Sequence, residues 1–293
     1  MRHLKIYRAI RSIYRNGSIR KAAEQLAVSP SALNRSIQAF EDELGVPVFD
    51  RVTGGVELTA AGELLLNVIN RHLTEFDEMQ SQMRSLQGGI TGSVRISLGE
   101  DISTGLLLRS VAEFETEFPG VSVEILHDNS IEGLKNRSVD LAILTNPATD
   151  DAVEVRFTQT VDLTAWGGAD DRPASGIWDL VEDRLILPPQ GTGTRTVFSH
   201  LMRRHRLSER SVTTVSADKM LPLLLAGNRA CVAPVVAFDF GALPAKALRH
   251  SLDLGQVQVA VLRASDIPAT RTVEALSMRL QGALERLAQN TAY

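Results

Sequence analysis

Two turns in the C-terminal two-thirds of the chain carry residue types that bind small anions. One places Ser103 and Thr104 before an amphipathic segment, and the other runs through Gln190, Gly191, Thr192, Gly193 and Thr194. In both turns hydroxyl donors lie where a helix is expected to begin, and the N–H groups of a helix N-terminus attract negative charge. A small carboxylate ligand therefore suits both turns, although such hydroxyls also serve as ordinary helix caps.

Further polar residues are weaker candidates for the same site. Asn129, Asn146 and Ser216 follow or precede expected strands and helices, and turn formation explains each of them as well. Asp101 lies beside the first turn, where its charge opposes an anionic ligand, and it has the alternative of pairing with Arg195. The hydroxyl groups and the expected helix ends are therefore the features that predict an anionic ligand.

Catalytic and metal sites are not indicated. The segment from Gly191 to Thr194 resembles a phosphate loop, but no Gly-Lys-Ser/Thr follows it, and the six histidines are scattered. The single cysteine, Cys231, lies in an apolar segment and is expected to be a buried strand thiol, with redox sensing as the alternative. We expect no enzyme activity, no catalytic residues and no metal.

The N-terminus is basic although the whole chain has a formal net charge of −4. Residues 1–40 contain eight Lys and Arg residues against one acidic residue, Glu24. Basic charge confined to one end of an acidic protein favours a polyanionic partner at that end, unless it is simply a solvated helix face.

Three helices and a hairpin are expected in this basic region. Apolar residues have helical spacing in residues 2–15, Ser18 is placed to cap a second helix, and Ser29-Pro30 is placed to open a third. Two short extended pieces around Thr53-Gly54-Gly55 predict a hairpin. This pattern is typical of a winged helix-turn-helix over residues 1–58, a DNA-binding unit. The expected DNA contacts are Ser29, Pro30, Ser31, Asn34, Arg35, Arg51 and Thr53.

Some of these contacts have structural alternatives. Ser29 is also a helix cap, Arg35 could pair with Glu41 or Asp42, and Arg51 could serve helix packing or an ion pair. If they face DNA, Asn34 suits adenine, while Arg35 suits guanine or phosphate.

A long helix is expected over residues 59–88, with side chains spaced alternately by four and three residues. Such a stripe is typical of a coiled coil between two chains, although a helix packed on its own domain is the alternative. The expected dimerisation residues are Leu65, Ile69, His72, Phe76, Met79 and Met83.

Residues 89–293 alternate short apolar strands with helices, which predicts an α/β domain built from parallel units. Two subdomains are expected, the first over about 92–162 and 266–293 and the second over about 163–265. No apolar run approaches the ~20 residues that span a bilayer, and no secretory signal is present, so a cytoplasmic protein is expected.

The N-terminal 62 residues resemble the LysR-type transcriptional regulators. The resemblance rests on the run from Gly17 to Leu26, on Val28 to Ile37, on Phe40 to Val46, on Val48 to Arg51 and on Leu58 to Gly62. Phe118-Pro119-Gly120 and Val139-Asp140-Leu141 are also similar to the family's effector domain.

This resemblance implies a winged helix-turn-helix, a linker helix and two α/β subdomains like those of periplasmic binding proteins. It implies a cytoplasmic regulator that binds double-stranded promoter or operator DNA, associates with itself as a dimer or a dimer of dimers, and contacts RNA polymerase. It also places a co-inducer in the cleft between the subdomains. The alternative is an α/β ligand-binding or enzymatic protein whose N-terminal helices only mediate association.

Overall fold

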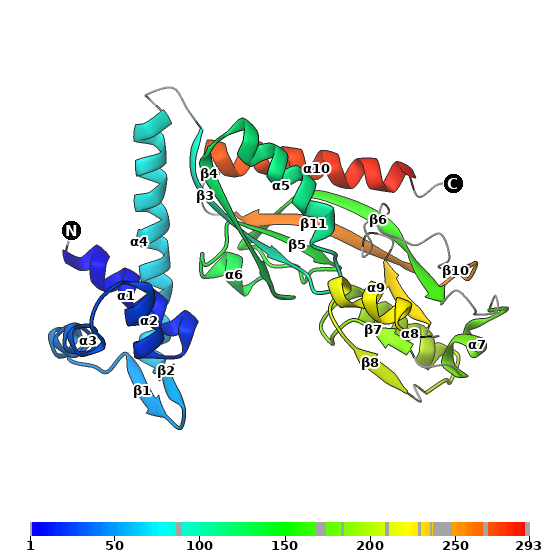
Figure 1. Ribbon diagram of the computed structural model, residues 1–293, viewed down its shortest axis with the longest axis horizontal. Coiled ribbons are helices and arrows are strands. Elements are labelled where there is room, and N and C mark those ends of the chain that lie inside the picture. The colour runs from blue at the N-terminus through cyan, green and yellow to red at the C-terminus, as the bar shows by residue number, and fades with distance from the viewer. Residues whose placement is uncertain are drawn as a thin grey trace. The chain divides into compact units, whose positions relative to one another are not determined.

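A computed structural model describes residues 2–85, 90–167, 174–182, 185–208, 211–227, 230–234, 236, 248–265 and 269–290. The chain divides into two compact units, residues 1–83 forming the first and most residues from 84 onward forming the second (Figure 1). The expected boundary between residues 88 and 89 lies outside the described residues.

The first unit begins with three helices, α1 (Arg2–Asn16), α2 (Ile19–Gln25) and α3 (Pro30–Leu44). The side chains of Ser18 and Ser29 accept hydrogen bonds from backbone N–H groups in the first turns of α2 and α3, as their positions predicted. Gly45 ends α3 in the left-handed conformation, with φ 74°. These caps fix the helix boundaries, and the apolar faces of the helices meet in one core that includes Ala9, Ile10, Ile13, Ala22, Ala23, Leu33 and Ile37.

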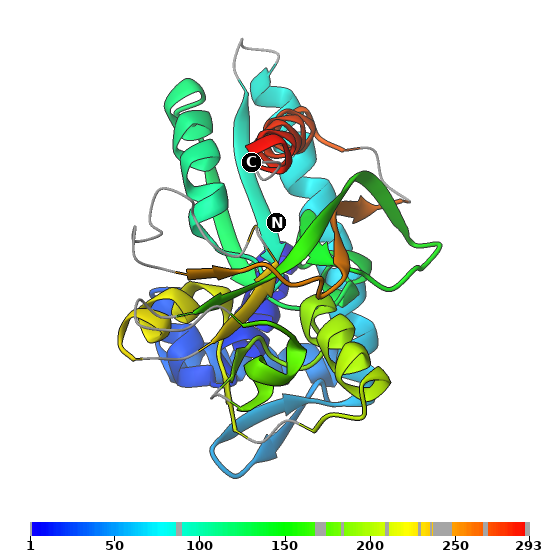
Figure 2. The same ribbon diagram turned by 90° about the vertical axis from the view of Figure 1, so that its right-hand side faces the viewer.

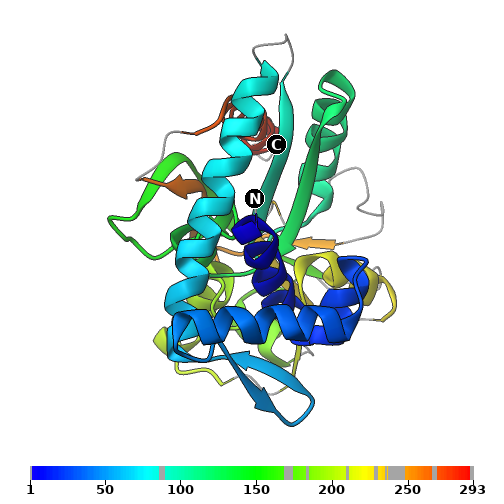
Figure 3. The same ribbon diagram turned by 90° about the vertical axis from the view of Figure 1, so that its left-hand side faces the viewer.

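A hairpin and a long helix complete this unit (Figure 3). Strands β1 (Phe49–Val52) and β2 (Gly55–Leu58) pair antiparallel and form the expected wing, and α4 follows over Ala60–Ser85. The carboxylate of Glu41 accepts hydrogen bonds from the backbone N–H groups of Val48 (2.7 Å) and Phe49 (3.1 Å). Helix α3 thereby holds the start of the wing in place.

In its described residues, the second unit is built on one mixed sheet of nine strands. Their order is β4-β3-β5-β11-β6-β9-β7-β8, with β10 paired to β6. The bounds are β3 (Thr91–Leu98), β4 (Gly120–His127), β5 (Leu141–Thr145), β6 (Val153–Gly167), β7 (Leu185–Leu187), β8 (Val212–Thr214), β9 (Cys231–Pro234), β10 (Leu248–His250) and β11 (Gln256–Ala264).

The helices of this unit divide between two lobes. In Figure 1 the first lobe contains β3–β5 with α5 (Gly105–Glu117), α6 (Glu132–Lys135) and α10 (Arg271–Asn290), and the second lobe contains β7–β10 with α7 (Ile177–Glu182), α8 (Gly193–Arg204) and α9 (Ala217–Leu225). Figure 2 views the unit from the end of the second lobe. Helix α10 packs against α5, β3 and β6 in the first lobe, although it comes last in the chain.

The α/β fold is confirmed, but its central strands differ from the parallel units that the sequence predicted. Strand β6 pairs antiparallel with β11 over residues 153–162 and then, over residues 163–167, with β9 and β10. The expected subdomain boundary at 162/163 thus lies inside one continuous strand. The first part of β6 alternates in burial and carries polar residues, so it lacks the apolar run that marked the other strands.

Candidate functional site

The residues expected to contact DNA lie at the start of α3 and on the wing. Ser29, Pro30, Ser31 and Arg35 are exposed, as are Arg51 and Thr53, while Asn34 is half-buried. Ser29 Oγ accepts the backbone N–H of Ala32 at 3.3 Å, so it does cap the helix, and its hydroxyl remains on the surface. The first turn of α3 therefore presents small polar groups and one cation to the outside.

Arg35 does not make the ion pair that was its structural alternative. Glu41 is engaged with the backbone before the wing, and among the residues that the structure describes neither Arg35 nor Arg51 has an ion-pair partner. A groove between α1 and α3 is lined by the basic residues Lys5, Arg8 and Arg35, with Glu43 as its acidic residue. Arg35 is thus exposed on a basic face and available to bind a phosphate or a guanine.

The expected dimerisation stripe on α4 divides into two parts. Met79 and Met83 are 44% and 59% exposed, His72 is exposed, and Leu65 and Phe76 are half-buried. Ile69 has no exposed surface and lies in the core of the first unit with Leu73. The prediction that Ile69 contacts a second chain was therefore wrong, because the N-terminal part of α4 packs on its own unit. The other five residues of the stripe stay predicted interface residues.

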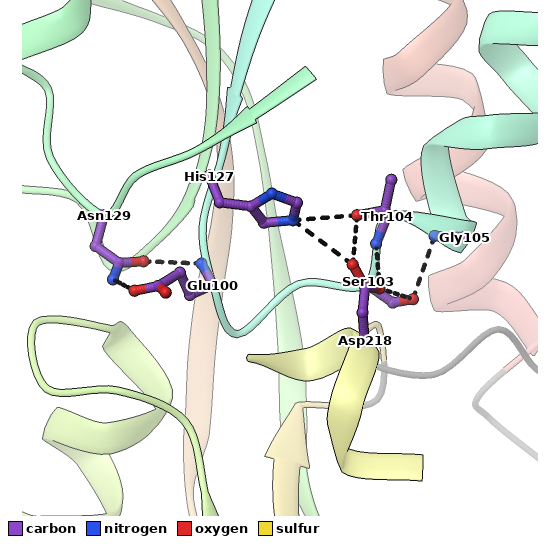
Figure 4. A network of polar contacts seen from close by, with 7 residues as sticks. All are labelled: Glu100, Ser103, Thr104, Gly105, His127, Asn129 and Asp218. Carbon is purple, nitrogen blue, oxygen red and sulfur yellow. Dashed lines mark hydrogen bonds and ion pairs between the residues drawn. The ribbon is translucent and has the colours of Figure 1, made fainter. Parts of the chain in front are cut away.

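The first polar turn holds a carboxylate of the chain itself (Figure 4). Asp218 Oδ1 accepts the hydroxyl of Ser103 at 3.0 Å and the backbone N–H of Thr104 at 2.8 Å, while Oδ2 accepts the hydroxyl of Thr104 at 2.6 Å. His127 Nε2 lies 3.1 Å from the Thr104 hydroxyl oxygen and 3.6 Å from Oδ2 of Asp218. These donors surround the carboxylate at the N-terminus of α5.

The second polar turn also faces a carboxylate from the opposite lobe. Asp101 Oδ2 accepts the backbone N–H of Thr194 at 3.0 Å and the hydroxyl of Thr145 at 2.6 Å. Thr145 Oγ1 in turn accepts the N–H of Gly193 at 2.8 Å. Asp101 is fully buried, and burial raises the pKa of its carboxyl, with the hydrogen bond from Thr145 acting in the other direction. Asp101 thus pairs with the start of α8 rather than with Arg195.

The other expected effector residues are distributed around these two contacts. Thr192 caps α8, accepting the N–H of Arg195 and donating to the carbonyl of Pro189, while Gln190 and Gly191 are exposed. Asn129 holds Glu100 through both its amide atoms, at 2.8 and 2.7 Å. Asn146 is bonded to the backbone of Gln258, and Ser216 precedes α9 without a side-chain cap bond. Their roles as effector contacts stay predictions.

Sequence reasoning missed three participants, Asp218, His127 and Thr145. Each has a positional signal: Asp218 lies in the first turn of α9, while His127 and Thr145 are the last residues of β4 and β5. Both strands pair parallel with β3, so their C-terminal ends lie at one edge of the sheet, where ligands bind in α/β proteins.

The described part of the chain gives little support for a reactive cysteine or a metal site. Cys231 is buried, and burial raises the pKa of its thiol well above its ordinary value, which suits an inert strand residue. No group of three His, Cys, Asp or Glu residues placed for a metal ion occurs in the regions described. Within those regions, no helix is long and apolar enough to cross a membrane.

Gly193→Ala is expected to destabilise the second unit by about 1–3 kcal/mol, because an added Cβ overpacks a closed contact. That Cβ would lie 2.7 Å from the backbone carbon of Thr145 and 2.8 Å from its Cβ. Gly227→Ala is the matched control, since nothing lies within 4 Å of a Cβ there. Urea unfolding followed by tryptophan fluorescence reports on this unit, because the two tryptophans are Trp166 and Trp178. Equal losses of stability in the two variants would contradict the close approach.

Known proteins resemble this chain over both units. Residues 4–63 match the family described as bacterial regulatory helix-turn-helix protein, lysR family, and residues 87–285 match the LysR substrate binding domain. The transcriptional regulator PtxR of Pseudomonas aeruginosa is 35% identical over 132 residues, 45% of this chain and 42% of PtxR, so the match spans less than half of that relative. The transcriptional activator CmpR of Synechocystis is 24% identical over 226 residues, 74% of this chain and 73% of CmpR.

The fold agrees with these matches. The crystal structure of full-length CbnR in complex with its target DNA superposes with a TM-score of 0.62 at 19% identity, covering 97% of this chain and 99% of that one. The two family matches, over residues 4–63 and 87–285, fall on the two units already described. The chain therefore belongs to the LysR family of bacterial transcriptional regulators, with a helix-turn-helix DNA-binding domain and an effector-binding domain.

Proposed function

We propose that α3 and the wing bind operator DNA and that a small molecule held between the lobes of the second unit controls this binding. The observation that carries the DNA contact is Arg35, an exposed cation at the start of α3 whose nearby acidic residue, Glu41, is engaged elsewhere. Arg51 offers a second cation on the wing. Ser29, Ser31 and Asn34 supply hydrogen-bonding groups between them for bases or phosphates.

We infer that the effector carries a carboxylate. The turns at Ser103-Thr104 and Thr192–Thr194 offer hydroxyl and backbone donors at the starts of α5 and α8, and each already binds a carboxylate of the chain. An effector that contacts both lobes binds one arrangement of them better than others and shifts the population toward it. Such a shift is the source of control over DNA binding.

The regulator is further proposed to act as a dimer or a dimer of dimers in the cytoplasm, to contact RNA polymerase and to have no enzyme activity. Self-association is supported by Met79 and Met83, two apolar side chains exposed on α4. The absence of catalysis is supported by the relatives, whose names describe transcriptional regulators.

Selection of genomic DNA fragments by the full chain tests the proposal. The protein is expected to enrich fragments that share a pair of half-sites, and the binding constant should fall linearly with salt concentration on logarithmic axes. A variant lacking residues 1–58 is expected to enrich none of them. Equal enrichment by both proteins would refute DNA binding by the first unit.

A metabolite screen on the full chain tests the control. A true effector at 100 times its dissociation constant adds about 2.7 kcal/mol of stability, which raises the thermal midpoint of the second unit. It should also change the affinity for a selected fragment. A ligand that stabilises the protein without changing DNA affinity would contradict its role as effector.

A further inference from the structure

The carboxylate of Asp218 lies where a carboxylate effector would bind at the start of α5. It receives three hydrogen bonds, from the hydroxyl of Ser103 and from the backbone and hydroxyl of Thr104, at 2.6–3.0 Å. In Figure 4 the imidazole of His127 points to the same position from the end of β4. The donors that would recognise a free carboxylate are thus already used by the chain.

This contact joins the two lobes. Asp218 lies in the first turn of α9, in the second lobe, while Ser103 and Thr104 belong to the first. One further bond reinforces it, since the backbone N–H of Ala217 donates to the carbonyl of Glu100 at 2.7 Å. Displacement of the Asp218 side chain would therefore remove its three hydrogen bonds to the start of α5 and leave the backbone bond between Ala217 and Glu100 in place.

Among the described residues two carboxylates cross between the lobes, and Asp218 is the one of them that solvent can reach. Its side chain is 37% exposed, whereas Asp101 at the start of α8 has no exposed surface. A ligand can exchange with a partly exposed side chain by rotation of that side chain, but it cannot reach a buried one without separation of the lobes. The turn at Ser103-Thr104 is therefore the position at which competition can occur.

We propose that Asp218 is an intramolecular competitor of the effector. In the effector-free protein its carboxylate occupies the donors of Ser103 and Thr104, and an incoming carboxylate must displace it. This inference rests on the proposed function and deepens it, because it names the residue that sets both the ligand class and the threshold of response. The observed affinity is the intrinsic affinity multiplied by the fraction of molecules in which Asp218 has left the turn.

Acetate is the probe for this competition, because it is the free form of the aspartate side-chain group. In the full chain, Asp218→Ala should empty the turn, and acetate at about ten times its dissociation constant should then raise the thermal midpoint by roughly 3–5 °C. The wild-type protein should show little change under the same conditions. Tryptophan fluorescence follows the second unit, and sodium chloride at equal ionic strength provides the reference.

Two variants tie the effect to this turn. Asp218→Ala combined with Thr104→Val should lose most of the acetate effect, because a hydroxyl donor is missing. Asp179→Ala is the matched control: Asp179 is also in the first turn of a helix and accepts a serine hydroxyl and N–H, but from Ser175 in the same segment. Acetate should not stabilise that variant beyond the wild type.

Two results would overturn the proposal. They are an equal acetate effect in wild type and Asp218→Ala, or no acetate effect in either protein. If Asp218→Ala does not fold, Asp218→Asn keeps the shape of the side chain and should still bind acetate more tightly than wild type by a measurable factor. Binding of a selected DNA fragment by the same samples is a separate readout. If the acetate test fails but DNA binding is retained, the proposal that Asp218 competes with the effector is wrong, and the proposed DNA-binding function still stands.

Discussion

Arg35→Ala is expected to weaken operator binding by about 5- to 150-fold for each head that contacts DNA, because one arginine contact contributes about 1–3 kcal/mol. Arg35 is exposed at the start of α3, and none of the residues that the structure describes forms an ion pair with it that DNA would have to break. In a dimer both heads carry the change, so the two effects multiply. Fluorescence anisotropy with a selected operator fragment measures the affinity.

The salt dependence distinguishes the two kinds of interaction that Arg35 could make. If Arg35 binds phosphate, the slope of log affinity against log salt falls by about 0.9 for each phosphate that is no longer neutralised, and all sequences weaken alike. If it reads a guanine, preference at one base position in each half-site relaxes. Arg51→Ala on the wing should behave as the removal of a phosphate-binding group.

Arg109→Ala is the control for a change of net charge, since Arg109 is an exposed arginine on α5 in the second unit. Its affinity and salt slope should match the wild type. If Arg35→Ala and Arg51→Ala both bind like this control, the assignment of α3 and the wing to DNA is wrong.

The sequence predicted the elements well where a local signal marks their ends. Ser18 and Ser29 cap their helices through their own side chains, so the starts of α2 and α3 could be read without knowledge of the fold. Strands β5 and β7 are buried along their whole length, and they are short apolar runs of the kind that predicted the α/β domain. These capping serines and apolar runs lie in, or within a few residues of, the helices and strands whose ends they mark.

The partners across the lobes could not be predicted in this way. Asp218 is 114 residues from Thr104, and Thr194 is 93 residues from Asp101. Their contacts depend on β6 and β11, whose antiparallel pairing carries the chain from one lobe to the other. The hydroxyl-bearing turns were recognisable as anion sites, but the sequence could not reveal that the anions in them are side chains of the same chain.

Ile69→Asp is expected to unfold the first unit and abolish DNA binding. Ile69 has no exposed surface and packs in the core that holds α1, α2, α3 and α4 together. The change removes a buried aliphatic side chain and places a carboxylate there without a partner, a combination that costs about 4–5 kcal/mol or more. Domains have only about 5–15 kcal/mol of stability, so a unit of this size should lose most of its folded population. Circular dichroism should record a loss of helix.

Met79→Asp is expected to weaken association between chains without lowering the stability of the first unit. Met79 is 44% exposed on the same helix, so a charge there stays in water in the single chain and should leave the helix content unchanged. In a dimer that buries Met79 the same charge would be desolvated, and sedimentation should show the mass falling toward that of one chain. DNA affinity should then fall, because one head binds only one half-site. Retention of the full mass by Met79→Asp would show that the exposed part of α4 is not the interface. Retention of helix by Ile69→Asp would contradict the packing of α4 on its own unit.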